Sequence, residues 1–295
     1  MEFPASLAEI VADRYGLAGA PDPIVDGGDE CLLWRLAAPP VAVVRVSPAR
    51  RTVAGLAASH RVAAAFGVFV PEVTRPLAAW DGTTVFRWEN RPVSVWPLID
   101  GAPLDRENAD LRARAAALLA RLHLAATRVG DVVAKPVTED RTAAHPGSRL
   151  PDDALDAWCE RWLRHIEEPA GFVHGDFYRR NILCRDGRIV GLIDWDDARH
   201  DLLVTELAWA MWEFAKSPDG TTLTGERAAQ FLNDYRAAGG PVRPSPALIP
   251  LIRLQLRYEV DRAERARHRG EPVDETYQQS EIAAFDALRH MPCIV

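Results

Sequence analysis

Polar side chains follow three short apolar runs between residues 172 and 193. His174 and Asp176 come after the first run, Asn181 opens the second, and Asp194 closes the third. Asp186-Gly187 separates the second run from the third and is a strong signal for a two-residue hairpin turn. Because a hairpin folds the strand ends together, we expect Asp176, Asn181 and Asp194 to converge on one small volume.

Two carboxylates and one amide oxygen at this spacing suit phosphoryl transfer. One carboxylate accepts a proton from a hydroxyl, while the amide and the other carboxylate hold Mg2+ against phosphate oxygens. Asp176 takes the first role in this interpretation, and Asn181 and Asp194 take the second. In the alternative, Asp176 caps a turn, Asn181 satisfies backbone groups and Asp194 is a turn residue. The whole set, in order and with a hairpin between its parts, favours the chemical interpretation.

Two motifs in this region resemble those of the aminoglycoside phosphotransferase family. The first is His174-Gly175-Asp176 followed, after four residues, by Asn181-Ile182-Leu183, and the second is Ile193-Asp194-Trp195-Asp196-Asp197-Ala198. That family has a protein-kinase-like fold and includes antibiotic, homoserine, choline and methylthioribose kinases. His174-Gly175-Asp176 takes the place of the kinase His-Arg-Asp, and Asp194 that of the Asp-Phe-Gly aspartate. The resemblance implies ATP (or GTP) and Mg2+ as cofactors and a small-molecule hydroxyl as acceptor. Arg179 and Arg180 stand beside the base in the sequence and are candidates to neutralise transition-state charge; the alternative is that they are exposed to solvent.

The resemblance assigns the nucleotide phosphates to the N-terminal part of the chain. Gly27 and Gly28, between two expected strands, would let the backbone approach the phosphates, although a Gly-Gly pair can also be only a turn. Arg45, in the strand Val41 to Val46, falls where kinases carry a phosphate-gripping lysine, and its guanidinium offers phosphate a bidentate fork. The alternative is an edge-strand arginine that reaches water.

The helix after this strand departs from the family pattern. It should supply a glutamate that orients the cation, but the expected helix from Arg50 to Phe66 contains no Asp or Glu. Either Arg45 is positioned otherwise, by the phosphates or Asp194, or this lobe binds nucleotide weakly. If the nucleotide balances its charge, the empty protein should hold this side chain loosely.

The expected fold class is α+β, a two-lobed protein-kinase-like fold. A small lobe with an antiparallel β-sheet plus a helix, residues 1–99, would bind the nucleotide. A larger, mainly helical lobe with the catalytic hairpin, residues 100–295, would bind the acceptor. In the family adenine bonds the backbone between the lobes, where Pro97 could offer only its carbonyl and Ile99 its N–H.

Apolar periodicity and breakers predict the helices. They are expected over Ala5 to Tyr15, Arg50 to Phe66, Asp110 to Thr127, Asp152 to Glu168, Leu202 to Phe214, Gly225 to Ala238, Ala247 to His268 and Glu275 to Leu288. His123 is expected to be a hydrogen-bonded core residue, and Glu206 to brace the catalytic loop. Glu213, Tyr258, Glu259 and Asp261 are candidates to face the acceptor, although an exposed helix charge is the more ordinary role for each.

Composition narrows the class of protein. The formal net charge of −7 disfavours a nucleic-acid binder, and four scattered cysteines indicate neither a disulfide framework nor a zinc site. No signal peptide or long apolar run occurs, so we expect a cytoplasmic protein without a membrane partner, as a monomer or homodimer. The expected activity is that of a small-molecule kinase acting on an antibiotic, an amino alcohol or a related metabolite. The alternatives are a homoserine-, choline- or sugar-type kinase, or a non-catalytic nucleotide-binding relative.

Overall fold

The computed structural model describes residues 2–19, 21–24, 31–37, 41–129 and 147–291. These residues form two compact units. The N-terminal unit comprises the described residues of Met1–Pro103 and Asn181–Ala198, and the C-terminal unit those of Leu104–Gly130, Lys135–Arg180 and Arg199–Val295. The hairpin that carries Asn181 and Asp194 therefore groups with the N-terminal strands. The boundary that we expect near Ile99 stays a prediction.

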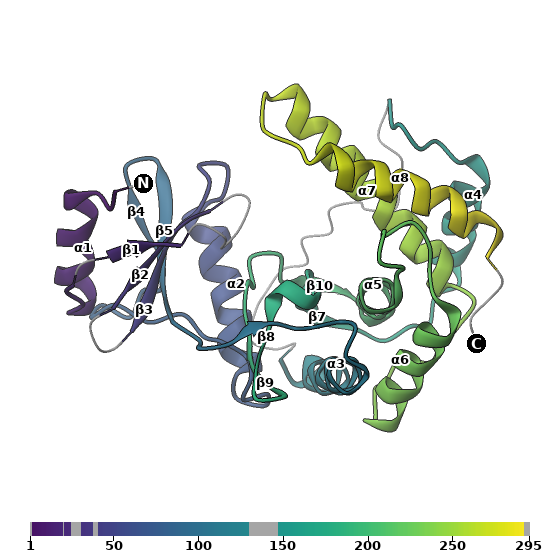
Figure 1. The fold of residues 1–295 in the computed structure, drawn as a ribbon, viewed down its shortest axis with the longest axis horizontal. Coiled ribbons are helices and arrows are strands. Elements are labelled where there is room, and N and C mark those ends of the chain that lie inside the picture. Colours follow the sequence, from purple (N-terminus) through teal and green to yellow (C-terminus); the bar gives the residue numbers. More distant parts are fainter. Residues whose placement is uncertain (1, 20, 25–30, 38–40, 130–146, 292–295) are drawn as a thin grey trace. The chain divides into compact units, whose positions relative to one another are not determined.

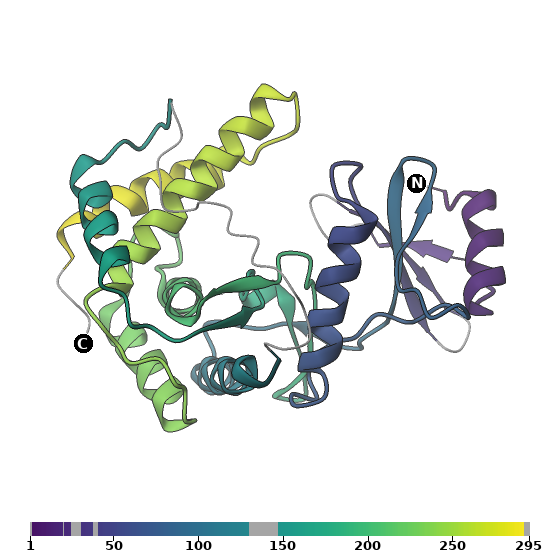
Figure 2. The same ribbon diagram turned by 180° about the vertical axis from the view of Figure 1, so that it is seen from behind.

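A five-stranded antiparallel sheet in the order β1-β2-β3-β5-β4 forms the centre of the N-terminal unit. Its strands are β1 (Pro21–Pro23), β2 (Leu32–Leu36), β3 (Ala42–Val46), β4 (Phe86–Trp88) and β5 (Arg91–Pro97). The first strand, β1, contains two prolines, which it tolerates because it lies at the edge of the sheet. Helices α1 (Ala5–Tyr15) and α2 (Val53–Phe66) lie on opposite sides of this sheet (Figures 1 and 2).

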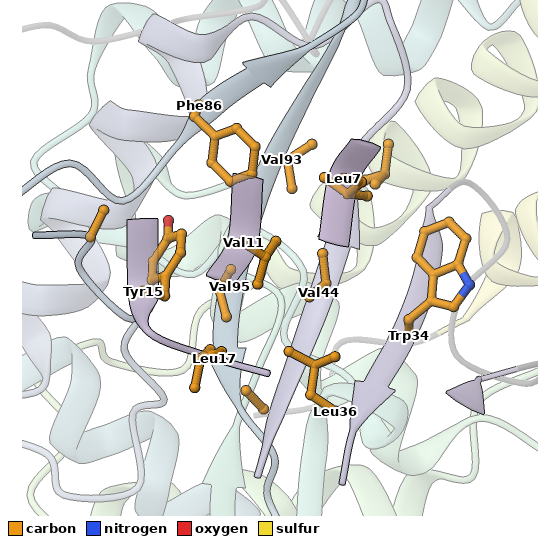
Figure 3. Packing of buried hydrophobic residues seen from close by; sticks show 13 residues of the cluster. Leu7, Val11, Tyr15, Leu17, Trp34, Leu36, Val44, Phe86, Val93 and Val95 are labelled. Atoms are coloured by element: carbon orange, nitrogen blue, oxygen red, sulfur yellow. The ribbon is translucent and has the colours of Figure 1, made fainter. Parts of the chain in front are cut away.

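Alternation along β3 divides its side chains between the two faces of the sheet. Val44 and Val46 are fully buried against α1, where Leu7, Val11 and Tyr15 meet them (Figure 3). Arg45 therefore points to the opposite face, the side of α2. Because alternate residues of β3 face opposite sides of the sheet, Arg45 can stand between Val44 and Val46 without entering the hydrophobic core that they form.

A three-stranded sheet completes the N-terminal unit. It contains β6 (Ala102–Pro103), β8 (Ile182–Arg185) and β9 (Arg188–Leu192), with β8 in the middle. Asp186 and Gly187 have φ angles of 51° and 70°, as a type I′ hairpin turn requires, so the predicted hairpin is confirmed. Backbone hydrogen bonds from Thr74 N to Leu192 O (3.0 Å) and from Leu192 N to Glu72 O (2.7 Å) attach the hairpin to the segment after α2.

Helices dominate the C-terminal unit, which also holds the antiparallel pair β7 (Ala170–Val173) and β10 (Arg199–Leu202). The helices are α3 (Ala109–Val129), α4 (Asp153–Arg164), α5 (Leu203–Ala215), α6 (Gly225–Ala237), α7 (Leu248–His268) and α8 (Glu275–Ala287). Helix α5 is buried over nearly its whole surface, as its almost continuous apolar sequence demands, and α3, α6 and α7 pack around it. No helix in the described ranges is long and apolar enough to cross a membrane.

Candidate active site

The loop after β7 carries Asp176, and its backbone is fixed on both sides of Gly175. The Gly175 N–H donates to Glu206 Oε1 (2.7 Å), and Arg199 Nη1 donates to the Gly175 carbonyl (3.3 Å). Gly175 has φ 86°, a conformation that disfavours any side chain here. The partly exposed Asp176 therefore starts from a rigid backbone position, as a general base needs.

Two buried side chains support Glu206 from the core of the C-terminal unit. Its Oε2 lies 3.1 Å from His123 Nε2, and His123 Nδ1 lies 2.7 Å from the hydroxyl of Tyr235. Burial alone would raise the pKa of Glu206, but the bonds from His123 and the Gly175 N–H hold it below its ordinary value. The expectations for His123 and Glu206 are both confirmed, and Tyr235 is a member of the network that sequence patterns did not reveal.

The β8–β9 hairpin brings Asn181 and Asp194 to the same end. The backbone N–H of Ile193 donates to the carbonyl of Asn181 (2.9 Å), and Asp194 directly follows Ile193. Asn181 is buried, whereas 40% of the Asp194 side chain is exposed. Asp194 also has φ 63°, a costly angle for a residue that is not glycine. The backbones of Asn181 and Asp194 thus lie at the same end of the hairpin within the N-terminal unit, while Asp176 belongs to the C-terminal unit. The convergence of all three stays a prediction.

Arg45 binds two carboxylates of the segment that follows β9. Its Nη2 lies 3.0 Å from Asp194 Oδ1, its Nη1 lies 2.9 Å from Asp196 Oδ1, and its Nε donates to Cys31 Sγ at 3.2 Å. Burial lowers the pKa of Arg45, but the two carboxylates outweigh that effect and raise it above the ordinary value. Burial, reinforced by Asp194 and opposed by Arg45, raises the pKa of Asp196 to about 6.

These contacts correct two expectations about Arg45. It is not a loosely held side chain, because two carboxylates and a thiol fix it. It is also not at a sheet edge, because β3 lies between β2 and β5. Asp194 does position Arg45, as one of the sequence interpretations allowed, and Asp196 is the partner that the sequence did not indicate.

The remaining candidate residues have different surroundings. Pro97 ends β5 opposite Ala42, and Ile99 is a partly exposed residue whose N–H has no hydrogen-bond partner among the described residues. Arg180 is exposed. Gly27 and Gly28 lie outside the described residues. The roles that we assign to these five residues stay predictions.

An acidic cluster in the C-terminal unit consists of Glu213, Glu259 and Glu281. Glu213 Oε1 pairs with Lys216 Nζ (2.5 Å), which lies 5.6 Å from the centre of the Tyr277 ring, and Tyr277 precedes Glu281 by one helical turn. Glu259 accepts hydrogen bonds from Gln255 and Arg262. The sequence analysis names Glu213 and Glu259 as candidates to face the acceptor, but not Glu281, because helix charges are ordinarily exposed.

Glu281 is the unusual member of the cluster. It is 4% exposed, and its Oε1 has no hydrogen-bond partner among the described residues. Burial, followed by the like charges of Glu259 and Glu213, raises the pKa of Glu281 to about 9. Partial burial and then the carboxylates of the cluster and of Asp176 raise the pKa of Tyr277.

The structure corrects the expected exposure of two acidic side chains among the acceptor candidates. Glu213 and Asp261 are 3% and 4% exposed, so the expectation of exposed helix charges is wrong for both. Asp261 accepts a hydrogen bond from Ser148 Oγ (2.8 Å) and so has a structural role. Tyr258 lies under the guanidinium of Arg265.

A comparison of sequences identifies the family. Residues 33–249 match the profile of the phosphotransferase enzyme family. The chain belongs to this family. Curated relatives are homoserine kinases: that of Nitrobacter winogradskyi is 25% identical over 64% of this chain and 60% of its own length. That of Mesorhizobium japonicum is 30% identical over 48% of each. The chain therefore spans about half to three-fifths of these relatives' length.

Solved structures of the same fold cover nearly the whole chain. An amicoumacin kinase, solved with AMP-PNP, Ca2+ and its antibiotic, has a TM-score of 0.72 at 11% identity and covers 99% of this chain and 95% of its own. A choline/ethanolamine kinase family protein from Mesorhizobium loti has a TM-score of 0.68 at 19% identity, covering 97% and 95%. The expected α+β, protein-kinase-like fold is confirmed.

Proposed function

We propose that this protein transfers the γ-phosphoryl group of ATP (or GTP) to a hydroxyl of a small molecule that carries an amino group. The observation that supports the phosphoryl-transfer part is the common end of the β8–β9 hairpin, where the backbones of Asn181 and Ile193 pair and the next residue, Asp194, binds Arg45. Two hard oxygen donors beside a fixed cation form a surface for a metal-bound polyphosphate. Family membership supports the same reaction type.

The donor set fits Mg2+. This ion prefers oxygen ligands and is commonly bound through one or two carboxylates, with substrate phosphates and water completing its shell. The Asp194 carboxylate is accessible enough to take part, and the Asn181 amide lies on the same hairpin. Mg2+ bound there would neutralise charge on the phosphates. Asp176 would accept the acceptor's hydroxyl proton, and Arg45 would grip the phosphates.

The other predicted residues complete the proposed nucleotide site. The Ile99 N–H and the Pro97 carbonyl would bond the adenine edge, and Gly27 and Gly28 would cover the phosphates. Arg180 would neutralise developing charge during transfer. Arg180 is exposed, and no described residue accepts a hydrogen bond from the Ile99 N–H; both observations are compatible with these roles.

The acidic cluster supports an amine-bearing acceptor. The buried carboxyl group of Glu281 has an oxygen, Oε1, that finds no hydrogen-bond partner among the described residues, and a buried polar atom without a hydrogen bond is costly. A ligand ammonium group would relieve this cost and the repulsion from Glu213 and Glu259. Antibiotics and amino alcohols offer such groups, and the curated relatives act on homoserine, an amino acid alcohol.

Nucleotide binding and acceptor turnover test the proposal separately. The melting temperature of the protein should rise with ATP and rise further with Mg2+, and Asp194→Ala should lose the Mg2+-dependent part. A panel of hydroxyl compounds, matched in pairs with and without an amino group, should then give ADP release mainly with the amine-bearing members. No stabilisation by nucleotide would refute the kinase assignment. Stabilisation without ADP release on any acceptor would favour the non-catalytic relative.

A further inference from the structure

Asp194 is engaged twice in the proposed site, because its Oδ1 bonds Arg45 and its carboxylate is the proposed Mg2+ ligand. Asp196 differs from it in burial. Only 5% of the Asp196 side chain is exposed, against 40% for Asp194. The accessible carboxylate can therefore exchange Arg45 for a metal. The buried one cannot give up its cation without leaving an uncompensated charge in the interior.

Helix α2 holds Asp196 in place without contributing a carboxylate of its own. Ser59 Oγ on α2 donates to the backbone carbonyl of Asp196 (3.3 Å). Arg51, just before the helix, reaches the same carbonyl from Nη1 (3.4 Å) and pairs through Nη2 with Asp197 Oδ1 (3.0 Å). The helix thus fixes the backbone that presents the Asp196 carboxylate to Arg45.

We propose that Asp196 is the positioning residue that aims Arg45 at the nucleotide phosphates, in the role for which α2 has no acidic side chain. When Mg2+ and nucleotide bind, Arg45 exchanges its bond to Asp194 for a phosphate oxygen and keeps its bond to Asp196. The inference rests on the proposed function, since it requires a phosphate ligand for Arg45. It assigns Asp196 no contact with metal or substrate.

A double-mutant cycle between Asp196 and Arg45 tests this assignment. Wild type, Asp196→Asn, Arg45→Ala and the double variant are titrated with the Mg2+ complex of AMP-PNP by calorimetry, and their melting temperatures are recorded. Asp196→Asn should weaken binding about tenfold, at the low end of what losing a charged hydrogen bond costs. In the Arg45→Ala background the same change should not weaken binding further. It should raise the melting temperature there, because it removes a buried carboxylate that has lost its cation.

Asp197→Asn is the matched control, since it removes the same charge one residue away, from a carboxylate that pairs with Arg51 and not with Arg45. It should change the affinity less than about twofold in either background, as is usual for a pair at the surface. Equal losses from Asp196→Asn in both backgrounds would overturn the proposal, because Asp196 would then act on the metal or nucleotide directly. Unchanged affinity with a lowered melting temperature would reduce Asp196 to a structural residue. A wild type that binds no AMP-PNP would instead refute the proposed function itself.

Discussion

At the scale of single residues, the backbone beside Asp176 is fixed at two points: the N–H and the carbonyl of its neighbour Gly175 are both hydrogen-bonded. Glu206 and Arg199 hold Gly175 from opposite sides. Such support positions a side chain without touching the reacting atoms, and small misplacements at a catalytic group are costly to rate.

Asp176→Asn should lower turnover by roughly a hundredfold or more, because a positioned general base contributes about 10²–10⁴. Nucleotide affinity should stay near that of the wild type, since the proposed phosphate and metal groups are elsewhere. Single-turnover measurement of phosphoryl transfer, with AMP-PNP binding as the control, checks both parts. Transfer at near the wild-type rate would exclude Asp176 as the base.

Glu281 gives the protein a pH-dependent stability of unusual sign. Its pKa is raised from 4.5 to about 9, so between these values the folded state holds a proton that the unfolded state has released. The free energy of unfolding should therefore fall as pH rises through this window, by up to about 1.4 kcal/mol per pH unit. Urea unfolding at pH 6 and pH 8 should show this loss in the wild type and not in Glu281→Gln. Glu275 is exposed on the same helix, so Glu275→Gln should keep the wild-type difference between pH 6 and pH 8. If the difference disappeared in Glu275→Gln, the assignment to Glu281 would be contradicted.

At the scale of elements, β9 packs closely against the segment that follows β5. A Cβ atom built on Gly191 would lie 2.9 Å from Ile99 Cγ2, a branched and stiff position. The glycine therefore lets the hairpin approach the backbone that we expect to bind adenine.

Gly191→Ala should destabilise the protein by about 1–3 kcal/mol, the usual cost of overpacking a core. It should also weaken nucleotide binding, because relief of the clash displaces Ile99. Thermal melts and AMP-PNP titration measure the two effects. Gly225→Ala is the control, since a Cβ there meets no atom within 4 Å. If Gly191→Ala lowered stability and left nucleotide affinity unchanged, Ile99 would not belong to the nucleotide site.

Sequence patterns predicted the elements better than the contacts between them. The helices were predicted to within a few residues at most ends, because apolar periodicity and local breakers such as Gly16 act over one or two turns. The pairing of β6 with β8 was missed, since two residues carry no period. The Arg45–Asp196 pair joins residues 151 positions apart, and no local signal reports such a contact. The burial of Glu281 was missed because charge ordinarily predicts exposure.

At the scale of the whole molecule, the described residues of the N-terminal unit come from two separated pieces of chain, 1–103 and 181–198. Residues 181–198 supply both carboxylates that hold Arg45 and the buried Trp195, whose ring lies 5.3 Å from that of Phe66. Residues 1–103 alone lack these partners. They would leave one face of α2 exposed and the Arg45 charge uncompensated.

A fragment of residues 1–103 should therefore show no cooperative thermal transition by tryptophan fluorescence. The same fragment joined to residues 181–198 through a short Gly/Ser linker should show one, because Pro103 pairs with Leu183 and a short linker can span the gap. A linked version that carries Arg45→Ala should melt lower than its parent. Cooperative melting of residues 1–103 alone would refute this view of the unit.

The two-piece N-terminal unit has a consequence for the order of events during synthesis. Ribosomes add about 5–20 residues per second, so residues 181–198 emerge roughly 5–20 s after residue 103. A β-hairpin needs only about 1–10 μs to form, so the first strands pair long before their last partners exist. During this wait the α2 face of the sheet presents apolar surface and an unneutralised arginine, the kind of surface that chaperones protect. The first unit in the sequence is thus finished only after α3 and α4 have been made, and the ribosome's rate sets the earliest moment at which Arg45 finds its carboxylates.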